Sequence, residues 1–512
     1  MLKFNFFSHF VLDNKIKKIL SFSQKGVKMK NLYKFIFCFL SFFLTNSFSQ
    51  PSPEQLRQAI LSNQNIHRFK GENFTWHAAY NADVFYKGYM TYKDEKWIEE
   101  GIKYFDFLIS KMDKEPDGYY GWVGPRLEDG KIYGAAIVGD ANLVNLMLSI
   151  AEIIVKDKEL YNKYGKKAEE YIKLGKDIIE KWDKRGCWYE QLGYGKYLVQ
   201  TKFILPEKPN EWIEMESWQI SENLNKSGKM GVVCLKLYRI LGDKFYRDRA
   251  VKIFSYYKSI MRYYQNEDRY VWNFWEPFAP CDMTGAPKHW VSVHPARACY
   301  QAAEVSLFVE AYHTGVLFDQ QDINRFINTN LWMWNKSYEN PKFKSSDGKT
   351  DAGTLWSSLS DFDETIRKLN QILLERGKGN FAIVEKDYFM NVICKEPPSY
   401  KRKYVKDEKE IIIPDIPIYN SEDISMAVVI PMVFDNWTKI SAKLEKDGKL
   451  EIYLYSKDGK MIEKIFEENV KSGYKTIRWD GKSKEGKKYQ GEYKIRFVFG
   501  NSIREVPIKI GG

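Results

Sequence analysis

The sequence predicts a mainly α domain of repeated helical hairpins followed by a small all-β sandwich. Residues 51 to about 390 repeat amphipathic helical patterns. Residues 395–424 carry prolines and mixed charge, which is typical of a linker. From residue 425 onward, apolar and polar residues alternate between turn signals. We therefore predict a helical domain over residues 50–394, a linker over 395–424 and a sandwich over 425–512.

The first 49 residues predict a leader. The stretch "MKNLYKFIFCFLSFFLTNSFSQ" begins at Met29 with a basic segment, and its apolar run is too short to span a bilayer comfortably. It ends in Ser47-Phe48-Ser49, the small-x-small form that a signal peptidase accepts. We expect an upstream extension over 1–28, a signal peptide over 29–49, and a secreted protein that is extracellular or at the cell surface.

Composition excludes several classes of function. The formal net charge is +12, but residues 1–49 alone carry eight Lys and one Asp, and no basic stripe follows them, so we expect no nucleic-acid partner. The cysteines are widely spaced and odd in number after the leader, which favours neither a disulfide scaffold nor a metal site. No phosphate loop, dinucleotide fingerprint or G-x-S-x-G occurs. We expect no cofactor and no metal.

The helical region contains an internal repeat. The segment "YMTYKDEKWIEEGIKYFDFLISKM" contains Asp94, and "LYRILGDKFYRDRAVKIFSYYKSIM" contains Asp243. These two segments align with a third around Asp157, and a fourth copy surrounds Asp319. In each copy an apolar helix ends in a short Asp-containing turn, and an amphipathic helix follows. The repeat predicts αα-hairpins, and residues 352–377 could supply another helix pair.

Three aromatic loops each follow the second helix of a hairpin: "DGYYGWVGPR" (117–126), "RGCWYEQLGYG" (185–195) and "EDRYVWNFWEPF" (267–278). If the hairpins wind into a ring, these loops lie on one rim. Exposed aromatic rings there would stack on sugars, or the aromatics would fill the core of the helical array. The residues that we expect to bind substrate from these loops are Trp122, Arg126, Trp272, Trp275 and Glu276.

The repeated hairpins and aromatic loops, together with "RILGDKFYRDRAVKIFSYY" and "VEAYHTGVLFDQQDINRFINT", resemble the (α/α)-toroid carbohydrate-active enzymes. That superfamily includes six-hairpin glycosidases, uronate-polysaccharide lyases and glucuronyl epimerase-like domains. The resemblance covers roughly residues 60–390. It implies a toroid of helical hairpins and an activity on a polysaccharide or oligosaccharide, without specifying the reaction.

The C-terminal region resembles the FlgD-type immunoglobulin-like domain. The matching residues are Trp479-Asp480-Gly481, Gly486, Gly491 and Tyr493. Turns are expected at Asp458-Gly459, Gly473 and Glu485-Gly486, with Trp479 and Tyr493 in the core. The resemblance implies a spacer or a module for cell-surface attachment, and no catalysis.

Two polar clusters precede or begin predicted helices. In "NFTWHAAYNADVFY", His77, Tyr80 and Asn81 would share one helix face, either as core residues or as a substrate contact. In "GAAIVGDANLVNLML", Asp140 would cap a helix, or act as a general acid or base near the rim.

A third cluster, "WIEMESWQISENLNKSGKMG", places Glu214, Glu216, Glu222, Asn223 and Asn225 before a strongly apolar helix. It is either a solvated helix entrance or part of a substrate site. A glycosidase needs two carboxylates from different places, so Glu216 would require Asp140 or Glu276 as its partner.

The fourth cluster is "KHWVSVHPARACYQAAE", with His289, His294, Arg297 and Tyr300 around a proline that favours the first turn of a helix. Its polar residues are either merely solvated or catalytic. These residue types, together with Asn223 of the third cluster, suit β-elimination of a uronate. Arg297 and Asn223 would neutralise the carboxylate, Tyr300 would transfer the proton and His294 would assist.

These observations predict a polysaccharide-active enzyme, with a uronate lyase or related epimerase as the main hypothesis. An inverting hydrolase that uses Glu216 with Asp140 or Glu276 is the first alternative. A non-catalytic extracellular glycan-binding or surface protein is the second.

Overall fold

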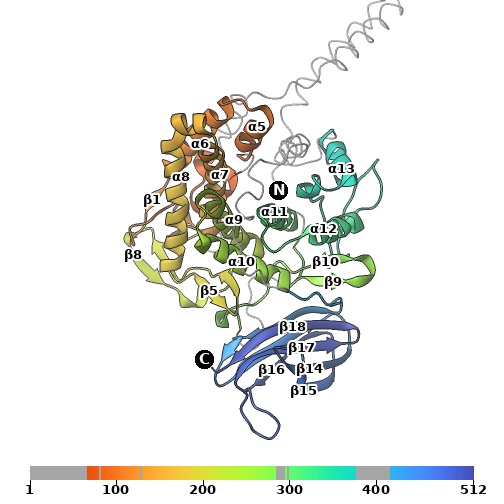
Figure 1. Ribbon diagram of the computed structural model, residues 1–512. Coiled ribbons are helices and arrows are strands. Elements are labelled where there is room, and N and C mark those ends of the chain that lie inside the picture. The colour runs from red at the N-terminus through yellow and green to blue at the C-terminus, as the bar shows by residue number, and fades with distance from the viewer. Residues whose placement is uncertain are drawn as a thin grey trace, which may run out of the picture. The chain divides into compact units, whose positions relative to one another are not determined.

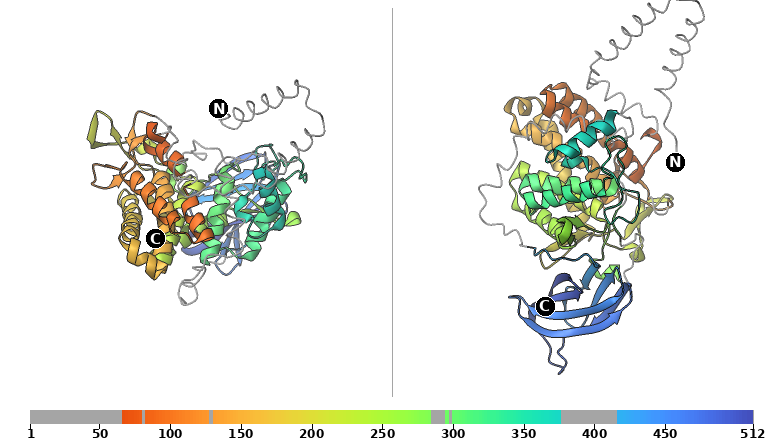
Figure 2. Two further views of the ribbon diagram at one scale, coloured as in Figure 1. Left: turned by 90° about the horizontal axis from the view of Figure 1, so that it is seen from above. Right: turned by 90° about the vertical axis from the view of Figure 1, so that its right-hand side faces the viewer.

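The computed structural model describes residues 66–511, apart from 80–81, 127–129, 284–293, 297–298 and 376–415 (Figures 1 and 2). The predicted leader and most of the predicted linker lie outside the described residues. The helices are α4 (Gly71–Ala79), α5 (Val84–Tyr92), α6 (Lys96–Ile109), α7 (Ile137–Lys156), α8 (Lys158–Lys184), α9 (Leu224–Leu241), α10 (Lys244–Ser259), α11 (Cys299–Thr314), α12 (Gln320–Met333) and α13 (Glu364–Glu375).

In the described part of the chain four helical hairpins follow one another: α5–α6, α7–α8, α9–α10 and α11–α12, the last of which is joined by the stacked rings of Phe308 and Phe326. Along the inner layer α4 packs on α7, α7 on α9, and α9 on α11, while α8 and α10 cover α7 and α9 from outside. The predicted mainly α toroid of repeated hairpins is therefore confirmed. The helix pair expected over 352–377 is a short 3₁₀ turn, Ser357–Leu359, and the single helix α13 within the described residues.

The repeated aspartates begin the second helix of every hairpin. The Oδ1 atoms of Asp94, Asp157, Asp243 and Asp319 each accept a backbone N–H from two or three residues downstream, at 2.9–3.0 Å. A carboxylate at this position satisfies N–H groups that lack a partner in the first turn and interacts favourably with the helix dipole. The register of the sequence repeat is thus the register of the helix starts.

Helix α7 is the apolar centre of the array. It is long and apolar enough to cross a membrane, the one such helix among the described residues, with a mean hydropathy of 1.6. However, 89% of its most apolar 18-residue stretch is buried inside the protein, where α4, α8 and α9 pack on the helix. Its hydrophobicity is accounted for by this inner position.

Short antiparallel strands follow the outer helices and carry the aromatic loops. β1 (Asp113–Lys114) pairs with β2 (Tyr120–Gly121), β5 (Trp188–Gln191) with β6 (Tyr194–Tyr197), and β9 (Arg262–Tyr264) with β10 (Arg269–Val271). A further sheet joins β3 (Gly124–Pro125), β4 (Tyr133–Gly134), β7 (Lys202–Leu205) and β8 (Lys208–Glu214). We call these strands and their connections the rim; they lead into the N-terminal ends of the inner helices.

The C-terminal part is a sandwich of two sheets, as predicted. One sheet has the order β11 (Ile424–Ile430), β13 (Thr438–Leu444), β16 (Gly473–Trp479). The other has the order β12 (Val433–Phe434), β18 (Ser502–Ile510), β17 (Gly491–Phe499), β14 (Gly448–Ser456), β15 (Met461–Val470). Trp479 is in the core, whereas Tyr493, in the central strand β17, is only half-buried. Gly459, Gly473 and Gly486 have positive φ in the predicted turns.

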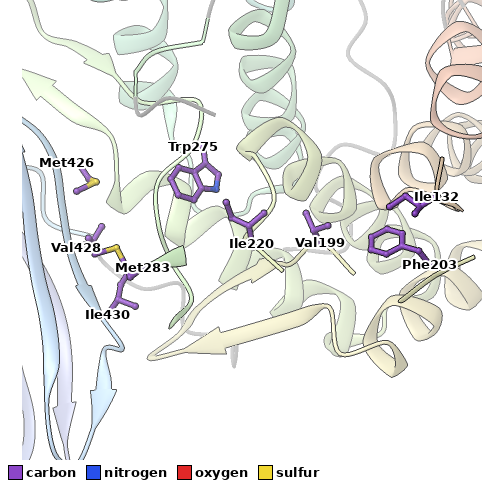
Figure 3. Close-up of a cluster of buried hydrophobic side chains, with 9 residues drawn as sticks. All are labelled: Ile132, Val199, Phe203, Ile220, Trp275, Met283, Met426, Val428 and Ile430. Carbon is purple, nitrogen blue, oxygen red and sulfur yellow. The ribbon is translucent and has the colours of Figure 1, made fainter. Parts of the chain in front are cut away.

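The sandwich packs on the rim through a continuous apolar cluster (Figure 3). Met426, Val428 and Ile430 of β11 contact the side of the rim that carries Trp275 and Met283. Polar contacts reinforce this interface: Asn273 Nδ2 donates to the Ser425 carbonyl at 2.6 Å, and both Arg504 Nη atoms donate to carbonyls at the end of α10. The C-terminal part is therefore docked on the helical part rather than joined to it only by a tether.

Candidate active site

Close backbone contact places the start of α4 beside the rim. Gly71 has φ +56°, and a Cβ built on it would lie 2.7 Å from Gly124 of β3. Only glycine fits both requirements at this crossing. The contact brings Glu72, in the first turn of α4, to Arg126, whose Nη1 is 3.7 Å from Glu72 Oε2.

The start of α9 supplies the other half of the site. Glu222 and Lys226 are four residues apart, and Lys226 Nζ lies 3.7 Å from Glu222 Oε2. The same Nζ lies 3.6 Å from Glu72 Oε1, so one lysine connects the starts of two inner helices. We call Glu72, Arg126, Glu222, Asn223, Asn225 and Lys226 the entrance cluster.

The entrance cluster is buried but its hydrogen bonding is incomplete. Its six residues are all at most 7% exposed, yet Glu72 Oε2, Asn223 Oδ1 and Asn225 Oδ1 accept no hydrogen bond from the described residues. Asn223 is the N-cap of α9, and its side chain makes no capping bond. Because buried polar atoms are nearly always hydrogen-bonded, these three acceptors have hydrogen-bonding capacity that a water molecule or a ligand would satisfy.

The charge state of Glu72 follows from its neighbours. Burial raises the pKa of its carboxyl, but the nearby Lys226 and Arg126 outweigh burial and leave the pKa below its usual value. The indole Nε1 of Trp76 also donates to Glu72 Oε1 at 3.4 Å. Glu72 is therefore an ionised carboxylate held in a dry environment.

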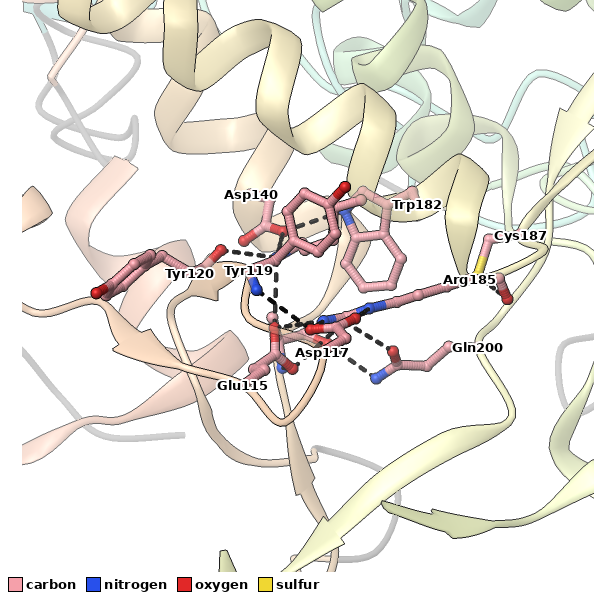
Figure 4. A network of polar contacts seen from close by, with 11 residues as sticks. Glu115, Asp117, Tyr119, Tyr120, Asp140, Trp182, Arg185, Cys187 and Gln200 are labelled. Atoms are coloured by element: carbon pink, nitrogen blue, oxygen red, sulfur yellow. Dashed lines mark hydrogen bonds and ion pairs between the residues drawn. The ribbon is translucent and has the colours of Figure 1, made fainter. Parts of the chain in front are cut away.

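A second, mostly buried charge cluster lies where the rim meets α7 and α8 (Figure 4). Lys181 Nζ is 2.6 Å from Asp140 Oδ2, and Arg185 pairs with Glu115 at 2.9 Å and with Asp117 at 2.8 Å. The Trp182 indole and Gln200 complete this set by hydrogen bonds to Asp140 and Arg185. We call these residues (Glu115, Asp117, Asp140, Lys181, Trp182, Arg185 and Gln200) the rim network.

The rim network corrects the predictions made for Asp140. The N-cap of α7 is Ala136, so Asp140 lies inside the first turn and does not cap the helix. Burial raises the pKa of its carboxyl and the Lys181 ammonium opposes that effect. Asp140 is 1% exposed, and its Oδ2 is held at short distance by Lys181 and by the Trp182 indole.

The predicted hydrolytic pair is not brought together. Glu216 is exposed on the 3₁₀ turn Glu216–Trp218, whereas Asp140 is fixed in the rim network. Glu276 is fully buried toward the sandwich, where Asn273 Nδ2 donates to its Oε1 at 2.7 Å and burial raises its pKa to about 7. Sequence spacing could not reveal that both proposed partners of Glu216 are interior residues.

The residues predicted for elimination meet in part around Phe274. Its N–H donates to the His294 carbonyl at 2.9 Å, its carbonyl accepts from Leu224 N–H beside Asn223, and its ring is 5.1 Å from that of Tyr300. Tyr300 is 47% exposed, and His294 Nδ1 lies 2.8 Å from the Pro295 carbonyl oxygen. His289 and Arg297 lie outside the described residues.

The three predicted sugar-stacking tryptophans are core residues, which decides between the two roles considered for them. Trp122, Trp272 and Trp275 are at most 1% exposed, and each indole N–H donates to a buried acceptor at 2.7–2.8 Å. A different rim tryptophan, the half-buried Trp212 of β8, lines a cavity of about 400 Å³. Its other lining residues are Asp117, Gly118, Tyr119, Lys184, Arg185 and Lys202.

Arg126 and His77 remain near the site. Arg126 belongs to the entrance cluster. His77 is on α4 with its ring stacked on Phe69 at 4.1 Å, and burial lowers its pKa. Tyr80 and Asn81, its predicted neighbours, lie outside the described residues. Among the described residues, no group of three His, Cys, Asp or Glu side chains could hold a metal ion.

Sequence reasoning missed Glu72 and Lys226 and did not select Glu222 as catalytic. Glu222 and Lys226 at i and i+4 gave a usable signal, because such a pair faces one side of a helix start. Glu72 precedes the polar stretch "NFTWHAAY" by one residue, and its partner on α9 is about 150 positions away in the chain. No local pattern reports that contact.

Comparison with known proteins finds distant structural similarity. No family model and no curated protein matches the chain. A glycoside hydrolase family 76 mannosidase from Bacteroides thetaiotaomicron VPI-5482 is 14% identical, with a TM-score of 0.35 over 58% of this chain and 69% of that chain. A cellobiose 2-epimerase from Spirochaeta thermophila DSM 6192 is 11% identical, with a TM-score of 0.35 over 62% and 71%.

An inactive variant of the α-1,6-mannanase of Salegentibacter sp. HEL1_6, in complex with α-1,6-mannotriose, is 13% identical. Its TM-score is 0.37 over 67% of this chain and 97% of that chain. Because the TM-scores and identities are low, we base no functional conclusion on these three similarities.

Proposed function

We propose that the protein is a secreted, glycan-active enzyme that hydrolyses glycosidic bonds, with Glu72 and Glu222 as its carboxylate pair. The observation that carries the proposal is that one ammonium, Lys226 Nζ, lies within 3.7 Å of an oxygen of each carboxylate. These two oxygens can therefore be no farther apart than twice that distance. Glycosidases place their carboxyls about 5–5.5 Å apart for retention and about 6.5–9.5 Å apart for inversion, and this limit is compatible with both.

The surroundings of Glu72 assign it one of the two roles, and Glu222 takes the other by elimination. Glu72 is ionised because Lys226 and Arg126 lower its pKa, which suits a base or nucleophile. In the inverting form, Glu72 takes a proton from water as the water oxygen attacks the anomeric carbon. Glu222 gives a proton to the glycosidic oxygen as the bond to the leaving sugar breaks.

Access to the cluster requires an opening motion, because the Glu72 and Glu222 side chains are only 1% and 3% exposed. Enclosure of this kind strengthens electrostatic effects on the reacting groups once substrate is bound. The cavity beside Trp212 on the rim offers an aromatic ring and several hydrogen-bond donors, the combination that sugar rings bind.

The test is a panel of neutral and uronate-containing polysaccharides incubated with the purified protein. We would follow both the release of reducing ends and the ultraviolet absorbance of a new C=C bond. The proposal predicts reducing ends without the absorbance. Glu72→Gln and Glu222→Gln should each lower kcat by about 10²–10⁴-fold, and the exposed Glu216→Gln should not. Loss of activity in Glu216→Gln alone would contradict the assigned pair.

β-Elimination is the second candidate, favoured by the juxtaposition of Asn223, His294 and Tyr300 around Phe274. In that case both signals rise together, and Tyr300→Phe abolishes them while Glu72→Gln does not. Binding of a glycan with neither signal would instead support the non-catalytic alternative.

A further inference from the structure

The outer face of the three-stranded sheet in the sandwich carries exposed aromatic and basic side chains. Trp437 is 39% exposed and Tyr474 is 43% exposed, and three cations, Lys439, Lys443 and Arg478, belong to the same face. We call these five residues the basic strip.

Strand register places the basic strip in one row. Lys439 pairs with Arg478 and Lys443 pairs with Tyr474 across β13 and β16, with Ser441 and Thr476 between them. Residues that are paired in this way point to the same side of a sheet. The row from Lys439 to Lys443 spans about 13 Å at the usual rise of a strand.

The basic strip adjoins the interface with the helical part. Lys439, Ser441 and Lys443 pair with Ile430, Val428 and Met426 of β11, whose side chains pack on the rim in the apolar cluster. One half of this sheet face is thus covered by the rim, and the other half continues outward as the basic strip.

Two of the three cations of the basic strip have no ion pair among the described residues. The nine outer-face positions of β11, β13 and β16 hold no acidic residue: Met426, Val428, Ile430, Lys439, Ser441, Lys443, Tyr474, Thr476 and Arg478. Among the described residues, Lys439 and Arg478 form no ion pair within 4.0 Å, and the Arg478 guanidinium lies over the Trp437 ring at 4.4 Å. Glu445, next to one end, is paired with Lys349.

We infer that the basic strip binds an acidic polysaccharide chain, as an accessory site separate from the entrance cluster. The cations would contact carboxylate or sulfate groups, and the Trp437 and Tyr474 rings would stack on the CH faces of sugars at the two ends. Between them lies the half-buried Thr476, whose hydroxyl is hydrogen-bonded to the buried Ser441 at 2.8 Å.

The experiment measures binding of polygalacturonate, dextran sulfate and neutral dextran to the full chain at low and high salt. We expect the two polyanions to bind, more weakly at high salt, and dextran not to bind. Lys439→Ala/Lys443→Ala/Arg478→Ala should weaken polyanion binding at least tenfold. Trp437→Ala/Tyr474→Ala should weaken it as well, without changing the charge. A melting curve of each variant confirms that it is folded.

The matched control is Lys484→Ala/Lys487→Ala/Lys488→Ala, which removes three exposed lysines from the loop between β16 and β17. Equal loss of binding in the control and strip variants would overturn the proposal, because it would indicate attraction to net charge alone. Equal affinity for a single-stranded DNA oligomer would overturn the assignment to a glycan. Glu72→Gln should bind the polyanions normally, so failure of the proposed catalysis and failure of this site are distinguishable.

Discussion

The entrance cluster and the rim network are both buried groups of charges near the starts of inner helices, but they are built differently. In the rim network, Asp140 pairs with Lys181, and Arg185 pairs with Glu115 and Asp117, at 2.6–2.9 Å, while Lys181 lies 3.5 Å from Glu115. In the entrance cluster, Glu72 lies 3.6–3.7 Å from its two cations. The rim network leaves one orphan acceptor, Asp140 Oδ1, whereas the entrance cluster has orphan acceptors on several side chains.

Under the proposed function, this difference separates charges that stabilise the fold from charges that bind a substrate. Short ion pairs with additional hydrogen bonds offset the cost of removing charges from water. Longer ion pairs with unsatisfied acceptors offset less of that desolvation cost. Their unsatisfied acceptors can still accept hydrogen bonds from a substrate. Burial alone does not separate the two classes, because Asp140 and Lys181 of the rim network are as buried as the entrance cluster.

Removal of Lys226 should have the largest effect. Lys226→Met takes the shared cation from Glu72 and Glu222, so we expect kcat/KM on the glycan to fall by more than about 10²-fold, or about 2.7 kcal/mol. Because Lys226 lowers the pKa of Glu72, the acidic limb of the pH–rate profile should also move to higher pH. Steady-state kinetics across pH test this, with the exposed Lys244→Met as the control. An unchanged profile would remove Lys226 from the site.

The corresponding change in the rim network should affect stability instead. Lys181→Met leaves Asp140 as an uncompensated buried charge, so we expect the free energy of unfolding to fall by about 3–5 kcal/mol. Activity per folded molecule should remain. Urea unfolding followed by fluorescence measures the first quantity. If the variant is as stable as the wild type, the rim network does not hold the fold.

Glu276 sharpens the comparison because it is a buried carboxyl in neither cluster. Burial raises its pKa from 4.5 to about 7, so the native protein keeps a proton that the unfolded chain releases. This contribution to stability is fully present below about pH 4.5 and is lost as the pH rises through 7, by at most about 3 kcal/mol. Between pH 5 and pH 8, the free energy of unfolding in urea should change less in Glu276→Gln than in the wild type. An equal change in both proteins would contradict the raised pKa.

Each cluster also has a tryptophan whose indole donates a hydrogen bond. Removing the two indoles should give the smallest difference in stability between the clusters. Trp182 Nε1 donates to Asp140 at 3.1 Å and Trp76 Nε1 donates to Glu72 at 3.4 Å. We expect Trp182→Phe to cost about 1–3 kcal/mol of stability, since it removes a hydrogen bond to a buried charge, and Trp76→Phe to cost less than about 1 kcal/mol. Thermal unfolding of the two variants measures both losses of stability. Equal losses would contradict the proposed difference between the two clusters.

Most of the fold could be predicted from the sequence because its signals are local. The aspartates at 94, 157, 243 and 319 are local helix starts, and alternation with turn glycines is a local property of the sandwich. The docking of the sandwich on the rim could not be predicted in this way. It depends on Met426, Val428 and Ile430 meeting Trp275, which are about 150 positions apart in the chain.

The site was harder to predict for the same reason. The sequence indicated the α9 entrance, where Glu222 and Asn223 lie, but not the contact of Glu72 with Lys226 across two helices. Residue type also gave wrong predictions where burial decides whether a side chain can contact substrate. Trp272 and Trp275 are in aromatic loops, yet their rings fill the core, and Asp140 is at a helix start, yet Lys181 holds it.

The most direct test of the account measures activity and unfolding together for Glu72→Gln and Asp140→Asn. We predict that Glu72→Gln loses about 10²–10⁴-fold in kcat while its free energy of unfolding changes by less than about 1 kcal/mol. Asp140→Asn should lose about 3–5 kcal/mol of stability and keep its activity per folded molecule. If Glu72→Gln instead unfolds at lower urea with normal kcat, the entrance cluster is structural and the proposed active site is wrong.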